Sequence, residues 1–366
     1  MIYWRKDHGP LAPTDALLGI ASSRYSPGVR EMTCREALSS SFAQAAEDLF
    51  RVGQIDISAE MVRRIVEDEG RRVLDVQKDR KLDPGWTATN DQKDTTLPHC
   101  VITGADGVKV PMITEAEKQK RRENKRKGRK TSSSKHRRGR KRKGSDQAYK
   151  EFKILAFYDK SHEHQYAVGT SGDHRVLGRL MRREAGRLRL DHAQTSYSVS
   201  DGADWIRRQY QSQLPMLSAN VLDYYHLREH VILAAKRVYG EESPDAEKWR
   251  KEMCACVLKE GPVQMLIEIN KLRHSLRSPV KRQALTQLEK YVSPRLEMLN
   301  YPEFQARGYD IGSGPTESFC KTLTRRIKGS GMRWDKPNAE GMMALAAVRQ
   351  SNLWQSYWKL QKASAA

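Results

Sequence analysis

The sequence predicts an α/β protein with a mixed-sheet core, an N-terminal helical region and an all-helical insertion. Three observations support this prediction. Strand-like and helix-like segments alternate between residues 100 and 245, whereas residues 246–308 show only the helical period. The region 1–82 is irregular up to residue 25 and helical in pattern from about residue 29, and a polar segment separates it from the core. We therefore divide the chain into five parts: a helical region (1–82), a linker (83–99), a core (100–245 with 309–366), a basic insertion within that core (115–148) and a helical insertion (246–308).

The chain has 366 residues, enough for two or three domains, and its composition excludes several classes of protein. It has no run of about 18 consecutive apolar residues, which a bilayer-spanning helix requires. Its first ten residues contain no apolar segment of signal-peptide length. The five cysteines are scattered without a C-x-x-C pair, so they predict neither a disulfide framework nor a cysteine-rich zinc site. We expect a cytoplasmic protein that does not interact with membranes.

The formal net charge is +21, and most of it lies in one segment. Residues 118–143 contain 16 lysines and arginines and one acid, so the rest of the chain carries a net charge of only +6. This excess predicts a polyanionic partner, and nucleic acid is the commonest one. The same segment has no apolar residues, and its cations repel one another. We therefore predict that the insertion at 115–148 is disordered.

The N-terminal region is predicted to contain a helix, a short turn and a second helix. Gly53 ends the first helix, which begins near residue 29, and Ser58 can cap the second. Arg63 and Arg64 lie off the apolar face of the second helix. This pattern is typical of a DNA-binding helix-turn-helix, and equally of a helical hairpin that only packs.

The core is predicted to follow the order strand, strand, strand, helix, strand, helix, strand. The first strand begins near Val101 and ends at Asp106-Gly107, followed by an alternating segment at 108–110. The other core elements are expected at 152–158, 165–168, 176–188, 197–199, 205–213 and 220–225. Helices follow at 226–239, 246–258, 263–276, 280–291, 316–328 and 339–360.

Three acids occupy positions where they can converge. Asp106 ends the first strand, Asp201 follows the fourth, and Glu317 lies on the first turn of a later helix. Carboxylates from neighbouring strand ends can together hold hard divalent cations. Two such ions, about 3.5–4 Å apart, can clamp the attacking and leaving oxygens of a displacement at phosphorus. Asp-Gly is also a strong turn signal, so a purely structural role for both aspartates remains open.

Several motifs resemble those of transposases of the Kra subgroup of bacterial insertion sequences, which are similar to Mutator-type transposases. The resemblance covers most of the chain from Ser26 onward and is most specific in the segment Gly-Ser-Gly-Met-Arg-Trp at 329–334. The other matching segments are 41–58, 200–206, 222–230 and 314–318.

This resemblance implies a ribonuclease-H-like core with a DDE metal site that binds Mg²⁺, or Mn²⁺ as a substitute. It implies Mg²⁺-dependent cleavage of transposon ends and strand transfer into target DNA, by a homo-oligomer assembled on DNA at the bacterial nucleoid. The implied catalytic and metal-binding residues are Asp106, Asp201 and Glu317. Asp159, near the end of the second strand, is the alternative first aspartate. The order of elements independently agrees with this core.

Cations in three places are candidate DNA contacts. On the last core helix, Glu317, Lys321 and Arg325 form one row, apart from an apolar row that is expected to face the sheet. Trp334 is either a core residue or a platform for DNA bases. The full candidate set is Arg63, Arg64, Arg121, Arg122, Lys125, Arg126, Arg137, Arg138, Arg140, Lys321, Arg325, Arg326, Lys328, Arg333 and Trp334.

The segment 226–230 matches H-x-x-E-H, a pattern found in some zinc peptidases. His226 and His230 share one helix face, so zinc binding with Glu229 as general base is one hypothesis. The alternatives are that the two histidines pack in the core, or that they lie beside the transposase site together with Asp223. A third function class is a DNA-binding transposase remnant without catalytic activity.

Overall fold

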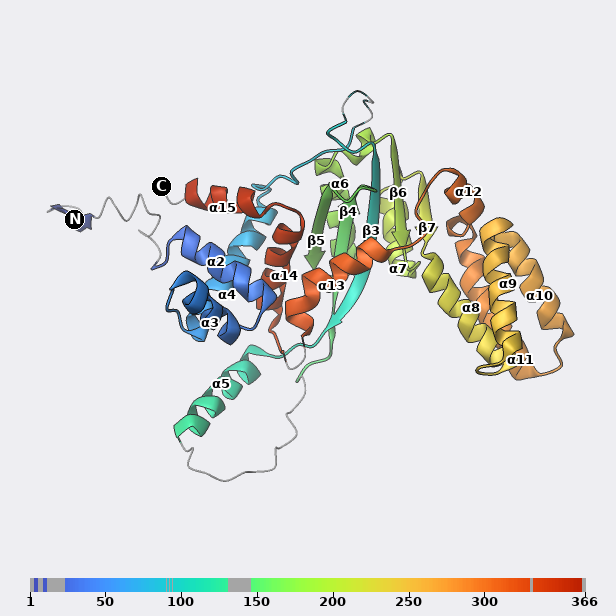
Figure 1. Ribbon diagram of the computed structural model, residues 1–366, viewed down its shortest axis with the longest axis horizontal. Helices are drawn as coiled ribbons and strands as arrows, with labels where there is room; N and C mark the ends of the chain where they lie inside the picture. Colours follow the sequence, from blue (N-terminus) through green and yellow to red (C-terminus); the bar gives the residue numbers. More distant parts are fainter. Residues whose placement is uncertain are drawn as a thin grey trace.

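Five segments rich in β-branched and aromatic residues pair into one mixed sheet in the computed structural model (Figure 1). The strand order is β5-β4-β3-β6-β7, in which β4 pairs antiparallel with both β3 and β5, and β3, β6 and β7 are parallel. The strands are β3 (Cys100–Val110), β4 (Lys150–Tyr158), β5 (Gln165–Thr170), β6 (Thr195–Ser200) and β7 (Ala219–Leu222). The structure describes residues 3–5, 9–11, 24–89, 91, 93, 95–130, 146–329 and 332–363, with the backbone alone for 3–5, 9–11, 125–130 and 363.

Strand β3 is longer than expected. The predicted end at Asp106-Gly107 is wrong, because β3 continues through both residues to Val110. Its partner β4 pairs with it over the whole stretch, placing Asp106 opposite Ile154 and Gly107 opposite Lys153. The backbone groups of Asp106 and Gly107 therefore take part in the pairing of β3 with β4 and not in a turn.

Helices cover both faces of the sheet. One face carries α6 (His174–Arg187) and α7 (Asp204–Gln213), and the other carries α13 (Gly314–Lys328) and α14 (Lys336–Gln350). Successive residues of β3 show this: the Thr103 hydroxyl lies 3.3 Å from Tyr210 Oη on α7, whereas Gly104 faces α13. Because both faces are covered, β4 is buried along its whole apolar run.

The N-terminal helices pack against the C-terminal ones. They are α2 (Pro27–Ser39), α3 (Phe42–Gly53) and α4 (Ala59–Lys78), and α4 crosses α14 so closely that a Cβ on Gly70 would lie 2.8 Å from the backbone of Gly341. Ser41 caps α3, so the single helix expected before Gly53 is two. The single helix expected at 339–360 is also two, α14 and α15 (Trp354–Ala363). A short two-stranded sheet pairs β1 (Tyr3–Arg5) with β2 (Gly9–Leu11).

The helical region beyond the sheet begins earlier than the expected boundary at 246. Its first helix is α8 (Tyr224–Tyr239), whose apolar face packs against α9 (Pro244–Lys259) and α11 (Pro279–Val292). Between and after these come α10 (Pro262–Ser275), the 3₁₀ helix η2 (Ser293–Met298) and α12 (Tyr301–Ala306). Asp223 caps α8, which is why β7 stops at Leu222 rather than near 225.

The basic insertion starts with a helix, where the sequence predicts disorder. Helix α5 spans Glu115–Lys130, and residues 131–145 lie outside the described part. The Thr114 hydroxyl accepts a hydrogen bond from the Glu117 amide, and Glu117 pairs with Arg121 one turn later. Acids in a first turn and an i,i+4 ion pair favour a helix despite the cations that follow.

The linker at 83–99 is irregular but packed, since Trp86 and Ala88 are buried and the Ala88 amide donates to Leu188 O. None of the helices in the described part of the chain combines the length and apolar character needed to cross a membrane.

Candidate active site

Three aspartates lie near one another on neighbouring parallel strands: Asp106 lies within β3, and Asp201 and Asp223 directly follow β6 and β7. The register of β3 with β6 pairs Thr103 with Ser198, and three further residues along each strand place Asp106 opposite Asp201. The register of β6 with β7, continued by one residue, places Asp223 opposite Asp201. All three side chains line one groove together with residues of α13, so they lie on the side of the sheet that α13 covers.

Helix α13 brings Glu317 to these aspartates through a close contact with β3. A Cβ on Gly104 would lie 1.8 Å from the Thr316 hydroxyl oxygen, so only glycine allows the first turn of α13 to touch the strand here. Phe319, Leu323 and Ile327 are buried, as the predicted apolar row requires. Glu317 therefore lies over the aspartates.

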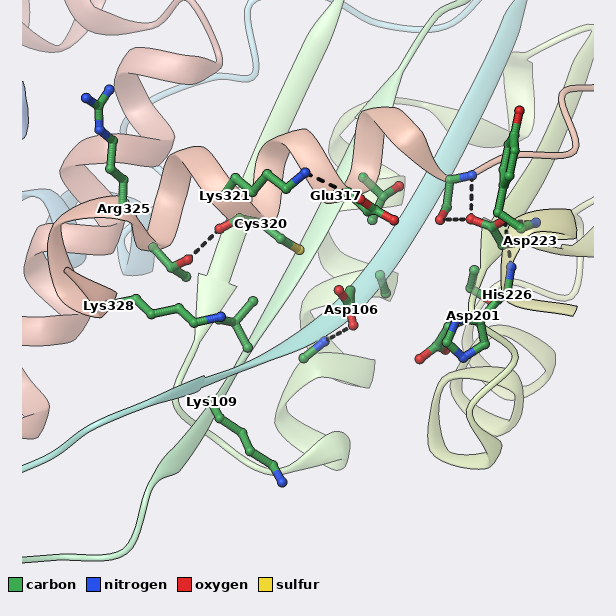
Figure 2. Close-up of a pocket in the computed structure, with 18 of the residues that line it drawn as sticks. Asp106, Lys109, Asp201, Asp223, His226, Glu317, Cys320, Lys321, Arg325 and Lys328 are labelled. Atoms are coloured by element: carbon green, nitrogen blue, oxygen red, sulfur yellow. Dashed lines mark hydrogen bonds and ion pairs between the residues drawn. The ribbon is translucent and has the colours of Figure 1, made fainter. Parts of the chain in front are cut away.

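The acids line a groove of about 830 Å³ between β3, α8 and α13 (Figure 2). Asp106, Asp201 and Glu317 all lie on its wall, so the structure brings the three predicted acids together. Lys321, Arg325 and Lys328 continue the same wall along α13. Lys109, Ser313 and Cys320 also line the groove, and sequence analysis did not identify them as site residues.

Asp106 is half-buried beside two other carboxylates. Burial raises the pKa of Asp106, and the negative charges of Asp201 and Glu317 raise it further. The Gly107 amide, 2.6 Å from Asp106 Oδ1, and the thiol of Cys320 donate hydrogen bonds that partly offset this rise. A site in which carboxylates repel one another favours a bound cation.

Asp201 also stabilises the turn that follows β6. Its Oδ1 accepts the Ala203 amide at 2.9 Å, which confirms the turn interpretation for this Asp-Gly pair. Gly202 has φ +71°, and a Cβ there would lie 2.2 Å from Leu222, so glycine is needed for this turn. Arg295 Nε donates to Gly202 O at 2.9 Å and fixes the turn from the helical region.

Asp223 connects two elements of the site. One carboxylate oxygen accepts the amides of Tyr225 and His226 at 2.7 and 3.3 Å, and the other accepts the amide of Ser313 at 2.9 Å and also its hydroxyl. Asp223 is buried, as expected for a residue beside the site. It therefore fixes the start of α8 to the start of α13, the helix that carries Glu317.

The arrangement does not form a closed metal cage. Among the described residues, no three His, Cys, Asp or Glu side chains stand close enough around one point to hold a metal ion. Glu317 instead faces Lys321, with 3.5 Å between Oε2 and Nζ, and its side chain is 59% exposed. The donor chemistry suits Mg²⁺, since three carboxylates share one groove and the most exposed of them has room to turn.

Asp159, the alternative first aspartate, lies elsewhere. It follows Tyr158, which pairs with Ile102, so it is near the other end of β3, about 13 Å along the strand from the Asp106 position. Its carboxylate holds the β4–β5 connection together by accepting from the Ser161 hydroxyl at 2.8 Å and from the His164 amide at 3.2 Å.

The histidine pair does not resemble a zinc site. The rings of His226 and His230 are 5.8 Å apart, as their helical spacing predicts, but His230 stacks on Tyr291 at 3.6 Å. Burial, and then the nearby His226 and Arg295, lower the pKa of His230. With no third ligand among the described residues, packing accounts for His230, while His226 lines the groove.

The structure buries two of the residues predicted to contact DNA, and for Trp334 this favours the core interpretation. Trp334 is 6% exposed, and its indole donates to Arg326 O at 3.1 Å. Arg326 is 5% exposed, donates to Ala37 O at 2.6 Å and lies 5.2 Å from the Phe42 ring. Both residues join α3 to the end of α13. Arg333, beside Trp334, is partly buried.

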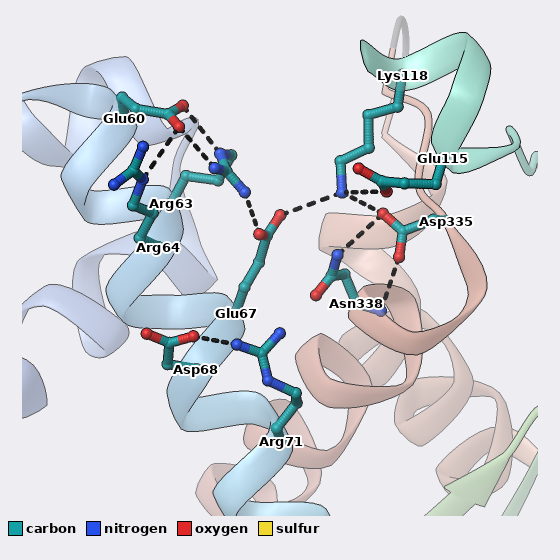
Figure 3. Close-up of polar contacts among 10 residues, drawn as sticks. All are labelled: Glu60, Arg63, Arg64, Glu67, Asp68, Arg71, Glu115, Lys118, Asp335 and Asn338. Carbon is teal, nitrogen blue, oxygen red and sulfur yellow. Dashed lines mark hydrogen bonds and ion pairs between the residues drawn. The ribbon is translucent and has the colours of Figure 1, made fainter.

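The arginines of α4 take part in an ion-pair network (Figure 3). Arg63 pairs with Glu60 and Glu67, and Arg64 Nε lies 3.3 Å from Glu60. This network, and the packing of α4 on α14, favour the packing interpretation of the helical hairpin. In the same network Lys118 of α5 contacts Glu67, Glu115 and Asp335, so the base of α5 is tied to α4 and to the start of α14.

The remaining predicted contacts belong to the basic insertion. Arg121 pairs with Glu117, and Arg122 lines a hollow between α4, α5 and α14. Lys125 and Arg126 lie on the part of α5 described by its backbone alone, and Arg137, Arg138 and Arg140 lie outside the described residues.

No protein-family model and no curated protein sequence matches the chain. Among solved structures, it is similar to the Drosophila P element transposase strand transfer complex, with 10% sequence identity and a TM-score of 0.30. The similarity covers 93% of this chain and 82% of that chain. Similarity at this level is too low to assign a fold or a function.

Proposed function

We propose that this protein is a DDE-type DNA transposase with Asp106, Asp201 and Glu317 as its acidic triad. The observation that carries the proposal is their convergence: three acids, separated by about 95 and 116 positions in the sequence, line one groove beside a row of cations. The strand order and directions of the sheet support a ribonuclease-H-like core. The buried row of α13 and the motifs at 314–318 and 329–334 point the same way.

Mg²⁺, with Mn²⁺ as a substitute, is the proposed cofactor, held by the three carboxylates. When bound, such ions activate a water or 3′-hydroxyl nucleophile and stabilise the leaving oxygen at phosphorus. The chain's own residues position the DNA. Lys321, Arg325 and Lys328 lie along one wall of the groove, where they would bind phosphates on either side of the scissile bond.

The proposed reaction has two parts: hydrolysis of a phosphodiester at each end of the element, then attack of the freed 3′-hydroxyl on target DNA. Because two ends must be held together for the second part, we propose that the protein acts as a homo-oligomer on DNA. Asp223 is a positioning residue in this scheme, since it fixes the α13 start to the α8 start.

A second candidate function is DNA binding without catalysis. One observation favours it: among the described residues no three ligands surround a single point. In that case the groove and the basic insertion would still bind DNA, but no divalent ion would support strand cleavage.

Strand cleavage distinguishes the two. An element that encodes its own transposase carries its ends on both sides of the gene, so labelled duplexes tiled across the flanking DNA include the substrate. We expect Mg²⁺-dependent cleavage by the wild type, and a loss of orders of magnitude in Glu317→Gln, which retains shape but not charge.

The matched control is Asp159→Asn, the same loss of one charge outside the groove, which should cleave normally once its fold is verified. Wild-type cleavage by Glu317→Gln would disprove the triad. Absence of cleavage by the wild type, with DNA binding retained, would support the second candidate.

A further inference from the structure

Helix α6 presents a cluster of arginines on the sheet face opposite the groove. Arg179, Arg182, Arg183 and Arg187 follow the spacing i, i+3, i+4, i+8, which places them along one side of the helix. Together with Arg80 they line a hollow of about 520 Å³. Arginine side chains gathered at one hollow repel one another, and this repulsion favours an anion bound there.

The carboxylates nearby do not neutralise the cluster. Buried Glu184 accepts from Arg183 Nε at 2.5 Å and from Arg187 Nη1 at 2.9 Å, and it also accepts the Tyr166 hydroxyl. Within the described residues, no carboxylate lies in ion-pair range of the three exposed members of the cluster: Arg80, Arg179 and Arg182. At least three positive charges therefore face solvent together.

The backbone holds Arg80 in an unusual conformation. Its φ of 59° is in the left-handed region, which glycine and asparagine adopt far more readily than arginine. This residue reverses the chain after α4, and Arg187 donates to Leu82 O, which ties the reversed segment to α6. The fold thus brings an arginine from another element to the α6 row.

We infer that this arginine cluster, formed by Arg80 and the α6 row, binds the phosphate backbone of a DNA duplex segment separate from the one in the groove. The α6 face lies across the sheet from α13, so one site cannot be an extension of the other along the same wall (Figure 1). Arginine forks suit phosphate oxygens, and contacts of this kind are independent of base sequence. The choice of DNA as the polyanion rests on the proposed function.

The test is the salt dependence of binding to a random-sequence duplex. Arg179→Ala with Arg182→Ala should reduce the magnitude of the slope of log K against log[salt] by about 2, and weaken binding about tenfold at about 0.2 M salt. The charge-matched control is Arg277→Ala with Arg282→Ala, two exposed arginines of the helical region. An unchanged slope in the α6 variant, or an equal change in the control, would overturn the inference.

A second measurement locates the DNA directly. A Cβ on Gly186, which lines the same hollow, would meet nothing within 4 Å, so Gly186→Cys can carry a photoreactive group without disturbing α6. We expect it to crosslink duplex DNA, and the crosslink to disappear in the Arg179→Ala, Arg182→Ala background. No crosslink, with wild-type affinity retained, would contradict the inference.

The two proposals fail in different ways. If the α6 inference alone is wrong, the wild type still cleaves flanking DNA and Glu317→Gln still abolishes cleavage, while the α6 variant binds normally. If the wild type binds no DNA, both proposals fall. If they are both correct, the α6 variant keeps Mg²⁺-dependent cleavage at saturating DNA, and Glu317→Gln keeps the wild-type salt slope.

Discussion

The half-buried Asp106 carboxylate is repelled by the two other acids that line its groove. Burial and then the charges of Asp201 and Glu317 raise its pKa, although Gly107 and Cys320 donate hydrogen bonds to it. A folded-state pKa above the ordinary aspartate value means that the folded chain binds the proton more tightly. The stability contributed by this group is therefore present at low pH and lost as the pH rises through the raised pKa.

Replacing this charge should stabilise the protein when no divalent ion is present. We expect Asp106→Asn to unfold at a higher temperature than the wild type at neutral pH in a chelator, by about 1–2 °C for each kcal/mol of repulsion removed. Mg²⁺ should stabilise the wild type, by about 2.7 kcal/mol at a hundred times its Kd, and leave the variant nearly unchanged. Thermal unfolding across a pH series, with and without Mg²⁺, measures both.

Asp159 is the control for this prediction, because its pKa is shifted in the opposite direction from that of Asp106. Burial alone would raise its pKa, but hydrogen bonds from His164 and Ser161 lower it overall. Asp159 therefore contributes stability above the ordinary aspartate pKa, and that stability is lost as the pH falls. Asp159→Asn should destabilise the protein at neutral pH. A stabilising Asp159→Asn, or a destabilising Asp106→Asn in chelator, would contradict the electrostatic account.

At this scale the sequence predicted the acids better than the cations. Their places beside strands and at one helix start, together with the family resemblance, selected Asp106, Asp201 and Glu317, and the three line one groove although β3 continues past Asp106. The surroundings of Trp334 were not predictable in the same way. It follows a Gly-Ser-Gly segment that suggests exposure, but Phe42, nearly 300 positions away, packs against its ring at 5.8 Å.

At the scale of elements, the site depends on how closely α13 approaches β3. The contact between Gly104 and Thr316 sets this approach, and Glu317 is the next residue on the helix. Gly104→Ala should push the first turn of α13 outward, destabilise the chain by about 1–3 kcal/mol and reduce cleavage more than binding. Denaturant unfolding and cleavage rates at saturating DNA measure these effects.

A second substitution tests the cause. Thr316→Ala removes the hydroxyl oxygen, the atom closest to the added Cβ, so the double variant should recover part of the lost stability and cleavage. If Thr316→Ala worsens Gly104→Ala instead, the close approach is not what positions Glu317.

Most elements of the core were predictable from periodicity, and the errors share a cause. Residues 108–110 were separated from β3 because Asp-Gly is a local turn signal, whereas the pairing with β4 is not visible locally. The helix at α5 was missed because net charge outweighed the two acids of its first turn. In both cases a few specific contacts determine the structure, and these contacts are not visible in the turn signal or the net charge of the segment.

At the scale of the whole molecule, the proposed DNA contacts fall into three groups. Helix α5, with which the basic insertion begins, the α13 row and the α6 cluster lie on different parts of the fold, so substitutions can separate their proposed contributions to DNA binding. Lys118 is an exception within the insertion, since its contacts with Glu67 and Asp335 neutralise it (Figure 3).

The insertion should dominate the salt dependence. If about eight of its cations contact phosphates, changing every lysine and arginine between 120 and 143 to glutamine should reduce the magnitude of the salt slope by roughly 7. Lys118→Gln alone should leave the slope unchanged and instead lower thermal stability. An unchanged slope in the multiple variant would mean that the insertion does not bind DNA.

The most direct measurement of the central claim is a map of the bound metal on the polypeptide. Fe²⁺ can replace Mg²⁺ at carboxylate sites, and with ascorbate and peroxide it generates hydroxyl radicals that cut the backbone close to the ion. We predict cuts near residues 106, 201 and 317 in the wild type. Excess Mg²⁺ and Glu317→Gln should suppress these cuts, and Asp159→Asn should not. Cuts that cluster elsewhere, such as at His226 and His230 alone, or no localised cuts, would contradict the proposed metal site.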